Sequence, residues 1–112
     1  MLIDFKNMEE KSIPNFKGGE KQYDVKMFDH EANKIMHGRL VPGASIGYHT
    51  HTDNCEIIYI LSGEGTVIGD KEKGEEDMPA VVGQAYYCPK GFSHSLVNTG
   101  SEDLIFFAVV AG

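Results

Sequence analysis

Two histidines separated by one residue, His49 and His51, have the type and spacing of metal ligands. Alternate residues of a β-strand project to the same face, about 7 Å apart at the backbone, so two ring nitrogens there can converge on one ion. Glu56 follows five residues after His51, which on an unbroken strand would place it on the opposite face. The segment 52–54 (Thr-Asp-Asn) is turn-forming, so the chain can reverse and return Glu56 to the same side. His94 can complete the set from a neighbouring strand.

Three imidazoles and one carboxylate would make a mixed nitrogen and oxygen site for one divalent transition metal per chain. Such ligands suit Mn, Fe, Co, Ni, Cu or Zn, and they must be deprotonated to bind. Taken alone, a His-X-His pair is more often an ordinary feature of a solvent-exposed strand than a metal site. The residues around the pair must therefore decide between these two interpretations. The two cysteines, Cys55 and Cys88, form no Cys-X-X-Cys pair. We interpret Cys55 as facing away from Glu56, and Cys88 as a small buried residue.

The elements that must position these side chains have the composition of an all-β protein. Ile and Val together number 17 and Leu only 5, and branching at Cβ favours strands. Thirteen glycines, most of them between short apolar runs, indicate many turns. About eight to ten short strands, with turn signals roughly every 8–12 residues, predict a sandwich or barrel without a helix longer than about two turns. The charged run 70–77 (DKEKGEED) is expected to be a solvated hairpin tip. The expected strands are Tyr23–Phe28, Ile35–Val41, Ile46–His51, Glu56–Leu61, Thr66–Ile68, Met78–Val82, Ala85–Cys88, Ser95–Asn98 and Leu104–Ala111.

Length and charge limit the classes of function. With 112 residues we expect residues 1–21 to form an N-terminal arm or edge strand and residues 22–112 a single barrel domain. Ten basic against seventeen acidic residues give a net charge of −7, which argues against nucleic acid or anionic membrane as partners. With no signal-peptide pattern in 1–10 we expect a cytoplasmic protein. The exposed edges of so small an antiparallel barrel predict a homodimer, with the arm crossing over.

Two spaced motifs frame the candidate ligands. The first has the form Gly-x5-His-x-His-x4-Glu-x6-Gly, and the second Gly-x5-Pro-x-Gly-x2-His-x3-Asn. Their ten defined positions are Gly43, His49, His51, Glu56 and Gly63, then Gly83, Pro89, Gly91, His94 and Asn98. In these motifs, which span about half the chain, the sequence resembles the cupin superfamily, in particular its small single-domain, conserved-barrel members. The second motif often begins Gly-Asp in this family and begins Gly83-Gln84 here.

The resemblance implies a small antiparallel β-barrel of jelly-roll type, with the metal held inside by His49, His51, Glu56 and His94. It also gives Gly63 and Gly83 positions in turns with positive φ, and Asn98 a hydrogen-bonding rather than a ligand role. If Glu56 points inward, Ile58 and Ile60 do too and form an apolar pocket floor.

Further candidates for substrate contacts are less constrained by the motifs. The aromatic residues Tyr87 and Phe92 could line the pocket or its rim, although packing is the alternative for both. Arg39 could clamp a substrate carboxylate through two hydrogen bonds. Pro42-Gly43 interrupts the alternation of side chains along the chain, however, so the sequence does not decide which face of the sheet Arg39 occupies.

Two functions from different classes follow from these residues. The first is a metal-dependent enzyme, an oxidoreductase, lyase or isomerase, acting on a small organic substrate inside the barrel; dioxygenase, decarboxylase and isomerase chemistry all remain open. Glu56 could stay bound to the metal or act as a base. The alternative is a non-catalytic module that binds a sugar or metabolite together with a metal. A complete ligand set favours the enzyme.

Overall fold

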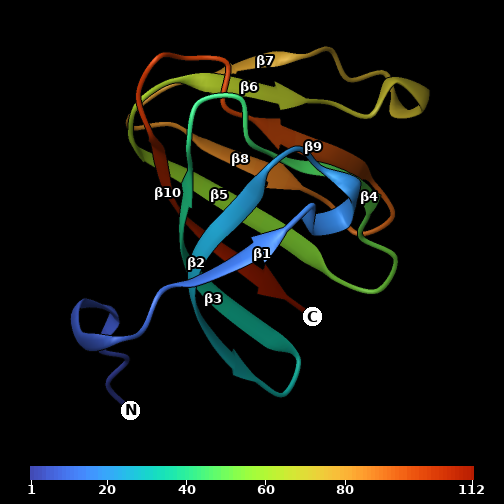
Figure 1. Ribbon diagram of the computed structural model, residues 1–112. Coiled ribbons are helices and arrows are strands. Elements are labelled where there is room, and N and C mark those ends of the chain that lie inside the picture. Colours follow the sequence, from blue (N-terminus) through green and yellow to red (C-terminus); the bar gives the residue numbers. More distant parts are fainter.

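The computed structural model describes all 112 residues and contains ten strands with three short 3₁₀ turns (Figure 1). The strands are β1 (Lys11–Pro14), β2 (Gln22–His30), β3 (Asn33–Leu40), β4 (Ser45–Thr50), β5 (Cys55–Ser62), β6 (Gly65–Ile68), β7 (Met78–Ala80), β8 (Ala85–Cys88), β9 (Ser93–Val97) and β10 (Leu104–Ala111). The 3₁₀ turns are η1 (Phe5–Asn7), η2 (Phe16–Gly18) and η3 (Lys71–Lys73). None of the three turns has the length or apolar character that a membrane-crossing helix requires.

All strand pairs are antiparallel and form two sheets. One sheet has the order β1-β2-β3-β10-β5-β8 and the other β4-β9-β6-β7. The sheets enclose a core to which both contribute, for example Ile58 and Phe106 from the first and Val67 and Leu96 from the second. This architecture confirms the prediction of an all-β antiparallel barrel of jelly-roll type with very little helix.

Alternation along β5 and β10 decides which side chains face the core. Glu56, Ile58 and Ile60 of β5 are buried, and the residues between them are exposed. In β10 the buried positions include Phe106, which lies opposite Ile60 in the register of the two strands. Strands of alternating burial therefore place a carboxylate, Glu56, on the same inner face as the apolar core.

A stacked aromatic pair fills the middle of the core. The rings of Tyr23 on β2 and Phe106 on β10 lie 5.8 Å apart between centroids, with an angle of 11° between their planes. They cover Gly38 of β3, where a Cβ atom would lie 2.5 Å from the Phe106 ring. Because Gly38 faces inward, its neighbour Arg39 faces outward.

Two glycines of the motifs lie in turns, as expected. Gly63 and Gly83 have φ values of +84° and +87°, so the expected positive φ is confirmed at both. The connection between β2 and β3 is a tight hairpin, because β2 continues to His30, which pairs with Asn33. Glu31 takes the positive φ (52°) that such a two-residue hairpin loop requires.

Asn98 ties three segments together from a fully buried position, with 1% of its surface exposed. Its Nδ2 donates to the carbonyl oxygens of Leu40 (2.8 Å) and Glu102 (2.7 Å). Its Oδ1 accepts from the backbone N–H of Gly100 (2.9 Å). The side chain therefore holds the turn before β10 against the end of β3.

The charged run at residues 70–77 is only partly a solvated tip. Asp70 is buried, caps η3 by accepting from the backbone N–H groups of Glu72 and Lys73, and also accepts from that of Ser93 (2.9 Å). The loop is thus attached to β9 one residue before His94.

Candidate metal centre

The four predicted ligands converge between the two sheets. His49 on β4 lies directly opposite His94 on β9 in the strand register. His51 follows the end of β4, and Glu56 reaches the same space from β5 of the facing sheet. His51, Glu56 and His94 are buried and His49 is partly buried. The structure therefore brings together all four members of the predicted ligand set.

The donor atoms of the cluster lie close to one another. Nε2 of His51 is 3.1 Å from Nε2 of His49 and 3.0 Å from Nε2 of His94. Oε1 of Glu56 is 3.2 Å from Nε2 of His51 and 2.9 Å from Nε2 of His94. One ligand atom from each residue lies within 4.8 Å of every other.

Hydrogen bonds on the far side of two rings fix their orientation. Nδ1–H of His49 donates to the carbonyl oxygen of Gly47 (2.7 Å), which can only accept. Nδ1–H of His51 donates to Oδ1 of Asn54, also at 2.7 Å. In the neutral rings the proton is then on Nδ1, and each Nε2 keeps its lone pair and directs it into the cluster. When His51 is protonated, its Nε2–H donates to Oε1 of Glu56 instead. Asn54, which the motifs do not mark, is thus placed in direct contact with a candidate ligand.

Burial and mutual contacts determine the charges. Burial raises the pKa of Glu56, but hydrogen bonds from His51 and His94 outweigh it and lower the pKa to about 2. Burial lowers the pKa of His49, whereas the hydrogen bond to Glu56 raises that of His51. At neutral pH the cluster therefore contains an ionised carboxylate and at least one neutral imidazole.

This donor set fits a divalent transition metal. Metal–nitrogen bonds of about 2.1 Å that meet near a right angle place the two nitrogens about 3.0 Å apart. The closest Nε2 pairs are 3.0 and 3.1 Å apart. Nitrogen lone pairs at such distances repel one another unless a cation or a proton lies between them. The cluster is therefore able to hold a metal ion through imidazole nitrogens and one carboxylate oxygen.

A cavity of about 270 Å³ opens onto the cluster. Apolar side chains form much of its wall, and Lys17, Lys34 and Asp53 contribute charged groups. The lining residues are Phe16, Lys17, Tyr23, Met27, Lys34, Met36, Ile46, His49, Thr50, His51, Thr52, Asp53, Asn54, Glu56 and Val110. The cavity is thus lined by both polar and apolar side chains, as small-molecule sites are.

The predicted substrate residues lie elsewhere. Ile58 and Ile60 face inward on the strand of Glu56, but they are packed in the core and do not line the cavity. Tyr87 has 60% of its surface exposed and lines a separate pocket, which it shares with His94. Phe92 supports the site through its backbone, since its carbonyl oxygen accepts from the N–H of His51 (2.9 Å). None of these four side chains is positioned to contact a ligand in the cavity.

Arg39 lies on the outer surface rather than in the cavity. Its guanidinium pairs with Glu10 (2.7 Å) and Asp103 (3.2 Å), and it lies 3.6 Å from Asp24. The hydrogen bond to Glu10 is the main reason that the pKa of Arg39 is raised. Its charge therefore links the N-terminal segment to the sheet, and the structure does not bring it to the candidate site.

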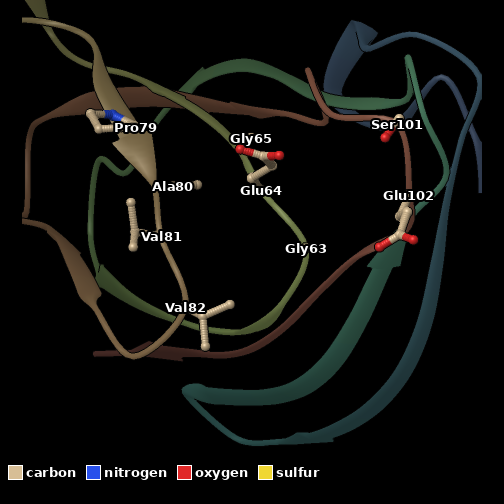
Figure 2. Close-up of a pocket in the computed structure, with 9 residues that line it drawn as sticks. All are labelled: Gly63, Glu64, Gly65, Pro79, Ala80, Val81, Val82, Ser101 and Glu102. Carbon is tan, nitrogen blue, oxygen red and sulfur yellow. The ribbon is translucent and has the colours of Figure 1, made fainter.

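A second cavity, of about 400 Å³, lies at the other end of the barrel. Figure 2 shows residues 79–82 along one side and Ser101 with Glu102 along the other. It is bounded by the turn after β5 and the turn before β10, whereas Glu56 lies near the start of β5. Glu64 and Glu102 are its charged residues and it contains no histidine or cysteine. Its lining therefore lacks the imidazole ligands that form the cluster in the first cavity.

Comparisons with known proteins agree with this geometry. The family described as Cupin domain matches residues 36–110. An oxalate-binding protein of Thermotoga maritima is 34% identical over 116 residues, which cover 98% of this chain and 93% of that protein. A crystal structure described as a predicted oxalate decarboxylase from Thermotoga maritima superposes with a TM-score of 0.89 at 30% identity, covering 99% of this chain and 98% of the other.

A partial likeness extends to a different chemistry. A glucose-6-phosphate isomerase of Thermococcus gammatolerans is 36% identical over 63 residues, which are 55% of this chain and 33% of that enzyme. The match to the family covers more than half of the chain and includes all four residues of the cluster. The chain therefore belongs to the cupin domain family.

Proposed function

We propose that this protein binds one divalent transition metal through His49, His51, Glu56 and His94 and uses it to bind a small carboxylate such as oxalate. The observation that carries the proposal is the position of the cluster, three of whose members, His49, His51 and Glu56, line a cavity of about 270 Å³. The likeness to an oxalate-binding protein over 98% of the chain supports a small carboxylate as the ligand.

The charges of the site favour an anion. A divalent ion, when bound, supplies a Lewis-acid centre that attracts carboxylate oxygens. Glu56 is the one ligand that is an anion, so it offsets only part of the charge of that ion. Lys17 and Lys34 add two positive charges to the cavity lining, against the single further negative charge of Asp53. The resulting positive balance inside an acidic protein attracts a small anion.

Two acid–base groups of the cavity, Glu56 and Tyr23, are poor candidates for a general base. A general base works best when its pKa lies near the working pH. Glu56 has a pKa of about 2 and hydrogen-bonds two imidazoles, so it is a weak base in this arrangement. Tyr23 also lines the cavity, and burial raises its pKa far above neutrality. Neither Glu56 nor Tyr23 therefore has a pKa shifted toward neutrality.

A second candidate function is metal-dependent decarboxylation of the same ligand. It is favoured by the structural likeness to a predicted oxalate decarboxylase, with a TM-score of 0.89. In this case the metal would provide the reactivity, and the chain would hold the substrate and exclude water with Phe16, Met36 and Ile46. Release of CO2 and formate from oxalate distinguishes this function from binding alone.

Calorimetric titration with oxalate tests the proposal. Protein loaded with Mn²⁺ or Co²⁺ is expected to bind oxalate, whereas protein treated with a chelator is not. His94→Gln, which removes one cluster nitrogen, is expected to abolish metal retention and oxalate binding together. Equal oxalate binding with and without metal, or no binding by the loaded parent, would show the proposal to be wrong. Formate and CO2 are measured on the same samples.

A further inference from the structure

The cavity mouth is bordered by a closed loop, residues 15–21, which we call the mouth loop. The backbone N–H of Asn15 donates to the carbonyl oxygen of Lys21 (2.8 Å), and its Nδ2 to that of Gly19 (3.0 Å). The loop is fastened to β4 by two hydrogen bonds between Glu20 and Ser45, one to the Ser45 hydroxyl (2.8 Å) and one from the Ser45 N–H (3.0 Å). It is therefore an ordered part of the site wall.

Two glycines allow the mouth loop to approach β4 at backbone distance. A Cβ atom at Gly47 would lie 2.0 Å from the carbonyl oxygen of Lys17, and one at Gly19 would lie 2.1 Å from that of Ser45. Gly47 also accepts the hydrogen bond from Nδ1–H of His49. One residue of β4 thus contacts both the loop and a cluster ligand, which fixes the backbone of Lys17 relative to the cluster.

The mouth loop holds Lys17 in a costly conformation. Four non-glycine residues have positive φ in this chain, and three of them, Asn15, Lys17 and Lys21, lie in this loop. Lys17 has φ 56° and ψ 28°, the left-handed region in which a Cβ atom is strained. Glycine would relieve this strain, whereas strain of this kind is typically retained at functional sites.

The amine of Lys17 is available to a ligand. The side chain lines the cavity beside Phe16, and Nζ lies 5.5 Å from the centre of the Phe16 ring. None of the ion pairs in the protein includes Lys17, although the chain has seventeen acidic residues.

We propose that Lys17 is a specificity-determining residue, which binds the second negative group of a dianionic ligand while the first is bound at the metal cluster. This role rests on the proposed function and deepens it, because it selects dicarboxylates over monocarboxylates of similar size. The loop conformation orients the Cα–Cβ bond of Lys17 before the ligand arrives, so less backbone entropy is lost on binding.

The test compares Lys17→Gln with Lys21→Gln in metal-loaded protein. Lys21 is a matched control because it has the same φ (56°) in the same loop, but its Nζ donates to the carbonyl oxygen of Pro42 and it does not line the cavity. We expect Lys17→Gln to weaken oxalate binding roughly 10- to 100-fold, as loss of a charged hydrogen bond does. Acetate binding is expected to stay within about twofold, Lys21→Gln to match the parent, and Lys17→Arg to restore part of the oxalate affinity.

Two further measurements separate this role from a structural one. The metal content of every variant is expected to equal that of the parent. Lys17→Gly is expected to lose oxalate affinity as Lys17→Gln does without a fall in Tm, since glycine accepts positive φ; a purely structural residue would lower Tm instead.

The failures of the two proposals are distinguishable. If the metal-loaded parent does not bind oxalate, the proposed function fails and the role of Lys17 fails with it. If the parent binds oxalate and Lys17→Gln binds it equally well, only the role of Lys17 is overturned. An equal loss for acetate, or an equal loss in Lys21→Gln, would also overturn it, because either result reflects general charge rather than a specific contact.

Discussion

Replacing Asn54 by alanine should weaken metal binding without removing a ligand. Oδ1 of Asn54 accepts the hydrogen bond from Nδ1–H of His51 at 2.7 Å. Without this acceptor the His51 ring is free to turn, and its proton can move to Nε2, the atom that faces the cluster. A proton on Nε2 must be displaced before a metal can bind there. In the variant, part of the binding free energy is therefore used to restore the tautomer with the proton on Nδ1.

The size of the effect follows from the position of the hydrogen bond. His51 is 7% exposed and lines the cavity, so water can replace the lost acceptor only from the cavity side. Loss of an outer partner of a metal-bound histidine typically costs 10- to 100-fold in affinity, which is about 1.4 to 2.8 kcal/mol. The loss of unfolding free energy without metal should be smaller, about 1 kcal/mol, as for one hydrogen bond.

A competition titration against a chromophoric chelator, with Co²⁺ or Mn²⁺ at constant pH, measures the change. Asn54→Asp keeps an acceptor at the same place, so its metal affinity should equal or exceed that of the parent. Asn33→Ala is a matched control, because Asn33 is exposed and its side chain, unlike that of Lys34, does not line the cavity. The reasoning is refuted if Asn54→Ala binds metal within twofold of the parent, or if Asn54→Asp is as weak as the alanine variant.

Three other predictions concern stability and assembly. Asn98→Ala breaks three hydrogen bonds to backbone groups and should lower the free energy of unfolding by about 3 kcal/mol; a urea titration showing a loss below about 1 kcal/mol contradicts this. The folded-state pKa of Glu56 is depressed to about 2, so its stabilisation is complete above its ordinary pKa of 4.5 and is lost as pH falls toward 2. Chelator-treated Glu56→Gln should therefore lack this acid-induced loss of stability. Acid titrations in which the parent and the variant lose stability equally would disprove this prediction. The exposed apolar residues Ile57, Tyr59 and Tyr87 predict a homodimer that Tyr59→Lys dissociates, and light scattering showing a monomeric parent at micromolar concentration would rule it out.

The local part of the site could be predicted because strand geometry has a simple period. His49 and His51 face the same space since they are two residues apart, and Glu56, Ile58 and Ile60 share the inner face of β5 for the same reason. The motif glycines also predict their turns, because positive φ is a property of the single residue. These features depend on neighbours in the sequence alone.

The rest depends on contacts between distant segments. The outward direction of Arg39 follows from the packing of Gly38 under two aromatic rings, which no local pattern reveals. Lys17 reaches the cavity only because Gly19 and Gly47, 28 residues apart in the sequence, let the mouth loop approach β4. Asp70 is buried because it accepts a hydrogen bond from β9, although its charged neighbours predict a solvated tip.

The metal content of tag-free protein, purified without added metal or chelator and then incubated with Mn²⁺, Co²⁺ or Zn²⁺ and desalted, tests the metal centre most directly. The convergence of His49, His51, Glu56 and His94 predicts about one transition metal ion per chain in the parent and a small fraction of that in His51→Ala. A parent that retains none of these metals, or a His51→Ala variant that retains as much as the parent, would contradict the four-ligand site.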